Sequence, residues 1–442
     1  MVRVAWGAII AFSLLGHEHA LADIEAARLR QELPGELVPI GQPVVRAAPM
    51  SLGDFESLAL ANSPALGKAA AAVGAARGRW LQAGLPPNPV AGYLATEIGN
   101  EGRAGQQGAY LGQEIVTGGK RRRDRAAMSH EIRRTEAELA AERFRVITDT
   151  RLAFFDALWA QRRVEIARQL AELSRQGVRT ATGLFQGQQV SEADVLQARI
   201  EAETTELLVV GAENDQSAAW RRLTAIVGLP ELAPAPMAGD LEAIGEPIAF
   251  EAALSRLFAS SPQIAAADAQ IGRAREALSR ARAERIPNLD VETAVQHDNA
   301  THFDYANVQI GMQLPIINRN QGAIAQAQAE LAAAQSERLL LRNELQHRLA
   351  EVYRRYAIAR ERVVRFRQRI LPDAQRTLQI ATRGYQAGEF NYLEFLTAQR
   401  TYFQSNMANL ESLRELQRSA AELDGFLLWG SLSGAAGTNP PG

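Results

Sequence analysis

The sequence predicts a mainly α protein that also carries membrane β-strands, with the same set of elements repeated in two halves. Three observations lead to this fold class. Two pairs of short segments place apolar residues at every second position, which is typical of strands with one apolar face. Two much longer segments repeat apolar residues every three or four positions, which is typical of long packed helices. Matching motifs recur at an offset of about 200 residues.

The composition is that of a folded protein with a sizeable core. The chain has 442 residues, of which 47% are hydrophobic and 22% charged, and its formal net charge is −2. This charge gives no reason to expect nucleic acid as a partner. Because the chain has no cysteine, it can hold no disulfide, thiolate metal site or cysteine-linked lipid.

Residues 1–22 are predicted to be a secretory signal peptide. Arg3 supplies the positive charge, residues 4–15 are apolar, and residues 20–22 form an Ala-Leu-Ala cleavage site. About twelve apolar residues are too few to span ~30 Å of hydrocarbon. No long apolar run follows, so entry into a membrane would have to use strands. Residues 23–50, rich in proline and glycine, are expected to form an extended segment.

Two structural repeats are predicted, at residues 51–228 and 250–428, joined by an extended linker at 229–249 and followed by a flexible tail at 429–442. Five pairs of motifs keep the same order and nearly the same offset. They are Asn62-Ser63-Pro64 with Ser260-Ser261-Pro262, Pro87-Asn88 with Pro287-Asn288, Leu111-Gly112 with Ile310-Gly311, Gly183 and Gly187 with Gly384 and Gly388, and Asp194-Val195-Leu196 with Glu394-Phe395-Leu396. The period is far longer than in solenoid repeats, which indicates a duplicated domain.

Four strands are expected, two in each repeat. Those of the second repeat lie at about 289–297 and 305–315, and those of the first repeat at about 90–98 and 107–116. The apolar positions of the second pair alternate with polar ones; they are Leu289, Val291, Thr293, Val295, Val308, Ile310, Met312 and Leu314. The first pair alternates less cleanly and holds more glycine. Each strand therefore has one apolar and one polar face.

Long helices are expected at about 120–182 and 322–383, each followed after a short turn by another helix, at 191–228 and 391–428. The apolar positions of the long helices keep heptad-like steps; they are Leu152, Phe155, Trp159, Ile166, Leu170 and Leu173 in the first repeat, and Leu345, Leu349, Val352, Tyr356, Ala359, Val363, Phe366 and Ile370 in the second. Some 60 helical residues would reach ~90 Å. Pro372 is expected to kink or break the second long helix.

Strands that cross a bilayer must close into a barrel, because an open edge would leave backbone groups unsatisfied in lipid. The chain offers four candidate strands, whereas roughly eight is the minimum for a closed barrel. If it spans, the chain must therefore oligomerise. The apolar faces would then meet lipid and the polar faces would line a lumen.

With the duplication and the paired motifs in view, residues 51–428 resemble the TolC family of outer membrane efflux proteins. The stretch 314–327 is similar to the strand-to-helix junction of its heavy-metal efflux branch, the CzcC-like proteins, and residues 388–400 are similar to the second helical hairpin. The resemblance implies a trimer, in which three chains of four strands and six main helices form a 12-stranded barrel continued by an α-helical barrel.

The resemblance also implies where the protein acts and with what. It implies an outer-membrane channel whose helical barrel reaches the periplasm and which completes a three-part pump with a periplasmic adaptor protein and a proton-driven inner-membrane transporter of the RND type. The channel would be a passive, gated conduit, most simply for divalent heavy-metal cations, with no cofactor. Two alternatives stay open: a multidrug, solvent or type I secretion channel, and, from another class, a secreted coiled-coil structural or adhesive protein.

In the family, polar links between helical hairpins close the periplasmic end. Asp194 and Tyr385 occupy matching positions and are expected to hold the closed state. Glu192, Asp194 and Glu394 are expected to give the aperture a preference for cations. Capping of a helix by Ser191 is an alternative role for this acidic stretch. The sequence departs from some relatives in having Phe390 where they carry a basic partner; it also has Thr397 where they carry a second carboxylate.

A basic run follows the second strand of the first repeat: Lys120, Arg121, Arg122, Arg123 and Arg125. Gly118-Gly119-Lys120 lacks the spacing of a phosphate-binding loop. The run is expected to lie at the inner headgroup boundary and to extend its charged ends toward water and lipid headgroups.

His297 and His302, with Asp298 and Asp304, stand in a candidate loop and are weak candidates for metal ligands, because nothing in the sequence fixes their geometry. The sequence shows no Ser-His-Asp set and no HExxH motif. An enzyme is therefore not expected.

Overall fold

The structure is a computed structural model that describes residues 49–99 and 104–432. The predicted signal peptide, nearly all of the segment at 23–50, and the tail beyond residue 432 lie outside the described residues. The chain divides into two compact units. The strand unit contains Ala69–Leu139 and Pro262–Leu341. The hairpin unit contains Ala140–Ser261, the chain from Arg342 onward, and residues 49–68.

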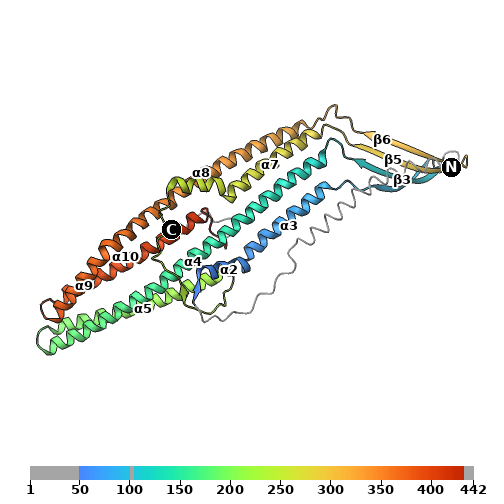
Figure 1. The fold of residues 1–442 in the computed structure, drawn as a ribbon. Helices are drawn as coiled ribbons and strands as arrows, with labels where there is room; N and C mark the ends of the chain where they lie inside the picture. Colours follow the sequence, from blue (N-terminus) through green and yellow to red (C-terminus); the bar gives the residue numbers. More distant parts are fainter. Residues whose placement is uncertain (1–48, 100–103, 433–442) are drawn as a thin grey trace. The chain divides into compact units, whose positions relative to one another are not determined.

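The order of elements repeats along the chain (Figure 1). The first repeat consists of α2 (Leu52–Asn62), α3 (Pro64–Gly84), β2 (Val90–Thr96), β3 (Gln106–Ile115), α4 (Lys120–Gln186) and α5 (Glu192–Val227). The second consists of α6 (Phe250–Ser260), α7 (Pro262–Ala283), β5 (Leu289–Asp298), β6 (Asp304–Met312), α8 (Gln321–Arg365), the π-helical turn η2 (Phe366–Ile370), α9 (Leu371–Gln386) and α10 (Tyr392–Asp424). Two short strands, β1 (Met50–Ser51) and β4 (Met237–Ala238), pair in parallel in the hairpin unit.

Proline and small polar residues set the helix starts. Pro64 and Pro262 are the first residues of α3 and α7, where a missing backbone N–H costs nothing. Capping boxes open α2, α5 and α10, at Ser51, Ser191 and Asn391. Among the described helices, none combines the length and the apolar character needed to cross a membrane.

In the strand unit, four antiparallel strands form one sheet in the order β2-β3-β5-β6, and three of them are labelled side by side in Figure 1. The central pairing, β3 with β5, joins the two repeats. Register places Leu111 opposite Thr293, and Thr293 opposite Val308. The period of two therefore continues across the sheet, with one apolar and one polar face.

Close contacts explain why the first-repeat strands contain glycine. A Cβ added at Gly108 would lie 1.9 Å from the carbonyl oxygen of Val295, and one added at Gly92 would lie 2.4 Å from the Tyr110 ring. Both glycines therefore let neighbouring groups approach the strand backbone. The weaker apolar alternation of the first-repeat strands has a structural cause.

The second long helix, expected as one element to about residue 383, is divided by η2, which begins six residues before Pro372. Within the turn, the Leu371 N–H donates to the Phe366 carbonyl oxygen, five residues back. Proline supplies no N–H and its ring crowds the carbonyl four residues earlier, so the wider π turn gives it room. The disturbance expected at Pro372 lies in the turn before it.

The hairpin unit is held by aromatic packing and ion pairs. Phe55 on α2 is fully buried and packs at 5.8 Å from Phe154 and 5.9 Å from Trp220, measured between ring centroids. Arg355 on α8 binds two carboxylates of α10, Glu415 at 3.1 Å and Glu422 at 2.5 Å. These contacts connect elements of each repeat to the long helices.

Candidate functional site

The polar face of the sheet carries a connected set of side chains. Asn307 donates to the Gln296 side chain at 2.9 Å, and Thr96 donates to Gln106 at 2.9 Å. The Tyr305 hydroxyl also donates to Gln106. The ladder crosses all four strands, from β2 to β6. A water-filled space on this side of the sheet would meet hydrogen-bonding groups.

The other face of the sheet is apolar and exposed within the chain. Val295 is 63% exposed, Val308 69%, Ile310 66% and Met312 52%. Aliphatic side chains left bare over neighbouring strands mark a contact surface. The sheet therefore has the chemistry of a wall between lipid and water.

The turns that join α4 to α5 and α9 to α10 meet in an aromatic cluster of the hairpin unit. Tyr385 stacks on Phe395 with ring centroids 5.3 Å apart, and Tyr392 lies 5.7 Å from Tyr385. Val195 and Ala198 of α5 belong to the same buried cluster. The cluster joins the helical hairpins of the two repeats.

Two of the three expected gate carboxylates, Asp194 and Glu394, cap helices in this structure. Asp194 accepts hydrogen bonds from the backbone N–H of Ser191 at 3.0 Å and from its hydroxyl at 2.8 Å. Glu394 accepts from the backbone N–H of Asn391 at 2.9 Å. Glu192 is exposed in the first turn of α5. Asp194 thus has the capping role that the sequence offers as an alternative, and Glu394 caps α10 in the same way.

Tyr385, the other expected gate residue, is 1% exposed, and its hydroxyl has no hydrogen-bond partner among the residues described. Burial and then the Asp194 carboxylate raise the pKa of Tyr385 to about 12. The phenol therefore keeps its proton at neutral pH and remains a donor. Asp194 and Tyr385 lie near enough to interact electrostatically, without a direct hydrogen bond.

The two departures from the family pattern have structural roles. A Cβ added at Gly384 would lie 2.8 Å from the Phe390 ring, so this aromatic ring covers the glycine at the end of α9. The Thr397 hydroxyl donates to the Leu393 carbonyl oxygen at 2.7 Å within α10. An apolar packing contact thus stands where a basic side chain was expected in some relatives.

Two links between the repeats were missed by the sequence reasoning. Arg400 binds Glu201 at 2.7 Å, and Gln399 donates to the Ser174 hydroxyl at 2.8 Å inside the unit. Both α10 residues belong to the stretch 388–400 that carries the family resemblance, and this was the available signal. Their partners stand 199 and 225 positions away, so spacing alone could not identify them.

The basic run has different roles at different residues. Lys120, expected to extend toward water, is 2% exposed; its Nζ donates to Asn288 at 2.7 Å and to Glu284 at 3.3 Å. The Arg125 guanidinium lies 3.8 Å from the centre of the Trp80 ring. Lys120 is drawn inward because two acceptors from the second repeat converge on it.

Arg121 and Arg123 are half-buried, whereas Arg122 is exposed. Headgroup contact remains a proposal for Arg122.

His297 and His302 lie close together, with ring centroids 6.3 Å apart, and His297 Nδ1 is 2.8 Å from an Asp304 carboxylate oxygen. Within residues 49–99 and 104–432, no group of three or more histidine or carboxylate side chains is arranged to hold a metal ion. Metal binding at this pair is not supported by the geometry.

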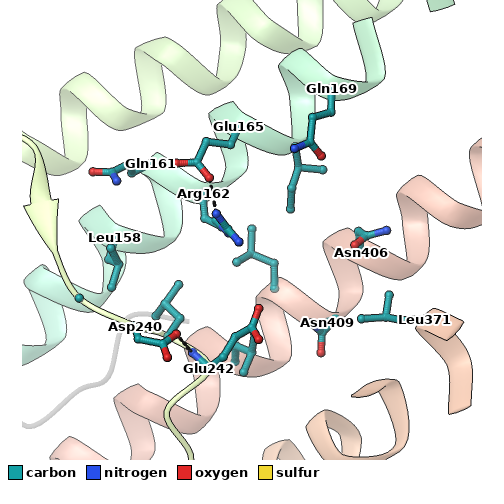
Figure 2. A pocket seen from close by; sticks show the side chains of 15 residues that line it. Leu158, Gln161, Arg162, Glu165, Gln169, Asp240, Glu242, Leu371, Asn406 and Asn409 are labelled. Carbon is teal, nitrogen blue, oxygen red and sulfur yellow. Dashed lines mark hydrogen bonds and ion pairs between the residues drawn. The ribbon is translucent and has the colours of Figure 1, made fainter. Parts of the chain in front are cut away.

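A cavity of about 330 Å³ lies in the hairpin unit between α4, α10 and the linker before α6 (Figure 2). In its lining, Arg162 pairs with Glu165 at 2.5 Å, and the Asp240 carboxylate accepts from the Glu242 backbone N–H at 2.8 Å. The side-chain Oδ1 of Asn409 is buried there with no partner in the described part of the chain. No catalytic set lines this cavity.

Comparison with known proteins places this geometry in context. The family model described as outer membrane efflux protein matches residues 56–229 and 253–427, one segment in each repeat. The cobalt-zinc-cadmium resistance protein CzcC of Cupriavidus metallidurans is 29% identical over 393 residues, which cover 88% of this chain and 93% of that protein.

Solved structures share the fold. A membrane protein from Pseudomonas aeruginosa superposes with a TM-score of 0.73 at 17% identity, covering 89% of this chain and 98% of its own. The outer membrane protein VceC of Vibrio cholerae gives 0.68 at 20% identity, covering 85% and 94%. CusC, described as forming a transmembrane channel, gives 0.68 at 19% identity, covering 90% and 100%.

Proposed function

The chain belongs to the outer membrane efflux protein family, and from that premise we propose that it forms the channel of a three-part efflux pump for divalent heavy-metal cations. Membership confirms the resemblance, the outer-membrane location and the efflux role expected from the sequence. The structural likenesses confirm the fold class. The alternative of a secreted coiled-coil rod is wrong.

The channel proposal rests on the two-faced sheet. Its apolar face suits lipid and its polar ladder suits a lumen, yet among the described residues β2 and β6 each end the sheet without a further partner strand. Closure needs roughly eight strands or more. Three copies would supply twelve and remove every edge, so we infer a homotrimer that forms a passive conduit without enzymatic activity.

Cations are proposed as cargo because the curated relative CzcC is named for resistance to cobalt, zinc and cadmium. An adaptor in the periplasm and an RND-type transporter in the inner membrane would complete the pump. Nothing in the channel needs to bind the cation tightly, since conduction requires weak sites.

Metal tolerance tests this cargo. A deletion strain should lose tolerance to zinc, cobalt or cadmium and recover it when the gene is restored, because the outer-membrane exit would be missing. Tolerance to lipophilic drugs and solvents should be unchanged. Loss of drug tolerance with intact metal tolerance would instead support the multidrug or solvent alternative, and loss of protein secretion would support the type I alternative.

We also propose that Tyr385 and Asp194 latch the closed hairpins. The neutral, buried Tyr385 hydroxyl lacks a partner among the described residues, and the nearby Asp194 carboxylate can accept a hydrogen bond from it. A small shift of the hairpins would connect the two groups. Glu192 and Glu394 would remain at the exposed helix starts and favour cations at the aperture.

Single-channel recording tests the latch. The double variant Asp194→Ala with Tyr385→Phe should conduct more than the unmodified channel in planar bilayers, because the closed state loses its link. Asp373→Ala with Tyr402→Phe makes the same chemical changes elsewhere in the hairpin unit and should leave conductance unchanged. Equal conductance of the two double variants would refute the latch.

A further inference from the structure

The connection between β6 and α8 exposes large aliphatic side chains outside any strand. Leu314 and Ile316 are each 68% exposed, and Ile317 is 89% exposed, the highest value for a large hydrophobic side chain among the described residues. A contiguous group of this kind at the surface of a folded unit indicates a contact surface.

Local bonds satisfy part of the backbone of this connection. The Ile316 N–H donates to the Leu314 carbonyl oxygen at 2.9 Å, and the Arg319 N–H donates to the Gln321 side chain at 2.8 Å. Pro315 has no N–H to satisfy. An irregular segment cannot lie deep in hydrocarbon, but it can lie against the hydrocarbon boundary, where water reaches its remaining backbone groups.

Two arginines flank the aliphatic group. Arg285 donates from Nε to the Arg319 carbonyl oxygen at 3.3 Å, and Arg319 donates from Nε to the Ile316 carbonyl oxygen at 3.3 Å. Both residues are exposed, and neither has a carboxylate at ion-pair distance within the described chain. Their terminal nitrogens are therefore available to an external anion, unlike Arg280, which binds Asp124 and Glu284.

The aliphatic group continues the apolar face of the sheet. On β6 the exposed residues Val308, Ile310 and Met312 lie on one face, and Leu314 is the next residue in the same alternation. If that face meets lipid, the connection reaches the edge of the same lipid layer at the end nearer the helices.

We propose that residues 314–317, together with Arg285 and Arg319, form an interfacial anchor that binds phospholipid in the periplasmic leaflet. The aliphatic side chains enter the boundary of the acyl layer, and the two guanidinium groups bind lipid phosphates. This inference rests on the proposed function, because it requires the strands to span. It assigns a lipid-binding role to the second strand-to-helix junction.

Site-directed fluorescence tests the anchor, and the absence of native cysteine makes single labels straightforward. Full-length channels carrying Ile317→Cys, Val308→Cys or Leu207→Cys are labelled with an environment-sensitive fluorophore. They are then reconstituted in phosphatidylethanolamine–phosphatidylglycerol vesicles that contain spin-labelled lipid. Val308 reports the sheet face, and Leu207, 72% exposed on α5, reports the hairpin unit.

Quenching by lipid at position 317 should approach that at 308 and exceed that at 207 several-fold. Quenching at 308 with none at 317 would refute the anchor and leave the channel intact. Protection of 317 from both lipid and aqueous iodide would also refute it, by showing that another chain segment covers the site. Absence of quenching at 308 itself would refute the spanning sheet, and with it the proposed function.

The arginines are tested separately by bound lipid. Arg285→Gln with Arg319→Gln should lower several-fold the phosphatidylglycerol retained by the purified oligomer, measured as phosphate per chain. Arg199→Gln with Arg376→Gln removes the same charge in the hairpin unit and should retain the normal amount. Equal retention by both double variants would refute phosphate binding by the anchor.

Discussion

At the scale of single residues, Lys120 shows how one side chain can join the two repeats. It is one of only two lysines in the chain, the other being Lys68. Its ammonium binds Asn288 and Glu284, and Asn288 in turn donates to Glu114 at 2.6 Å. Lysine fits here because its long, buried chain carries a compact charge to these polar groups.

Replacing Lys120 by Met should destabilise the strand unit by about 1–2 kcal/mol, because Asn288 and Glu284 lose the buried donor that joins them. Thermal unfolding of the purified protein would record this as a lower midpoint. Lys68→Met, at an exposed position, is the matched control and should leave the midpoint almost unchanged. Equal midpoints for both variants would contradict the assigned role.

Glu131 is a second residue on which the strand unit depends. It is 5% exposed on α4 and lies between three arginines, at 2.8 Å from Arg134, 3.3 Å from Arg273 and 3.4 Å from Arg79. The Arg134 hydrogen bonds lower the pKa of Glu131, against the opposing effect of burial. One carboxylate thus connects α3, α4 and α7.

The lowered pKa predicts how stability depends on pH. Because the folded-state pKa lies below the ordinary value of 4.5, the contribution of Glu131 is present above that pH and is lost as pH falls through the folded-state pKa. Glu131→Gln should cost about 1–3 kcal/mol at neutral pH and weaken the acid dependence. Melting curves recorded over a range of pH would measure both effects. Glu136→Gln, on the exposed face of α4, is the control and should change neither the stability at neutral pH nor its acid dependence.

At the scale of elements, the sheet depends on the close approach of β3 and β5. Gly108→Ala should prevent this pairing, since the new Cβ would lie 1.9 Å from the Val295 carbonyl oxygen. The β5 backbone could not move away without losing its hydrogen bonds to β3. We expect loss of the folded oligomer from the outer membrane, seen as loss of the heat-modifiable band on a gel. Gly311→Ala on β6 has open space around it and should assemble normally.

Heptad spacing correctly predicts the buried face of α8 but not the exposure of Ile370 in the π turn that follows it. Leu345, Val352 and Val363 are buried to 2% or less, as their spacing indicates, whereas Ile370, at the end of the same series, is 40% exposed. The π turn adds a residue to one turn of helix and rotates the series off the buried face. A fixed period cannot anticipate that rotation.

The first-repeat helix shows a second limit of periodicity. Phe155 and Trp159 belong to the predicted series yet are only half-buried, whereas Phe154 and Leu158 are buried. α2 places Phe55 against Phe154, which gives α4 an additional packed side. A periodic pattern predicts one buried side of a helix, so it does not predict the second buried side of a helix that packs on two sides.

For the candidate site, contacts between residues close in the sequence could be predicted, and contacts between distant residues could not. The spacing of Ser191 and Asp194 indicates a capping box from sequence alone. By contrast, the Arg400–Glu201 pair depends on how the hairpins of the two repeats meet in space. The inward turn of Lys120 depends on residues of the other repeat. Such contacts follow from tertiary packing, which no period encodes.

At the scale of the whole molecule, β2 and β6, the edge strands of the described sheet, predict assembly. The outer-membrane fraction should contain the protein as a particle of three times the mass of the mature chain, measured after solubilisation in detergent. Copies would pair β6 with β2 and leave no open edge in lipid. A monomer in that fraction would contradict the trimer, and a soluble protein would contradict the spanning sheet.

The strand order has a consequence for the time course of folding. The Thr293 hydroxyl on β5 donates to Leu111 on β3, 182 positions earlier in the chain, and the whole central pairing spans similar separations. Contacts so distant form late, because a long loop must close first. The β2–β3 hairpin therefore keeps the β3 edge unpaired, and prone to aggregation, until the second repeat is available to pair with it. A secreted fragment that ends at residue 250 should accumulate in aggregates or be degraded, and pulse-labelling would detect either outcome. The full chain needs protection from aggregation during export until its two repeats have paired.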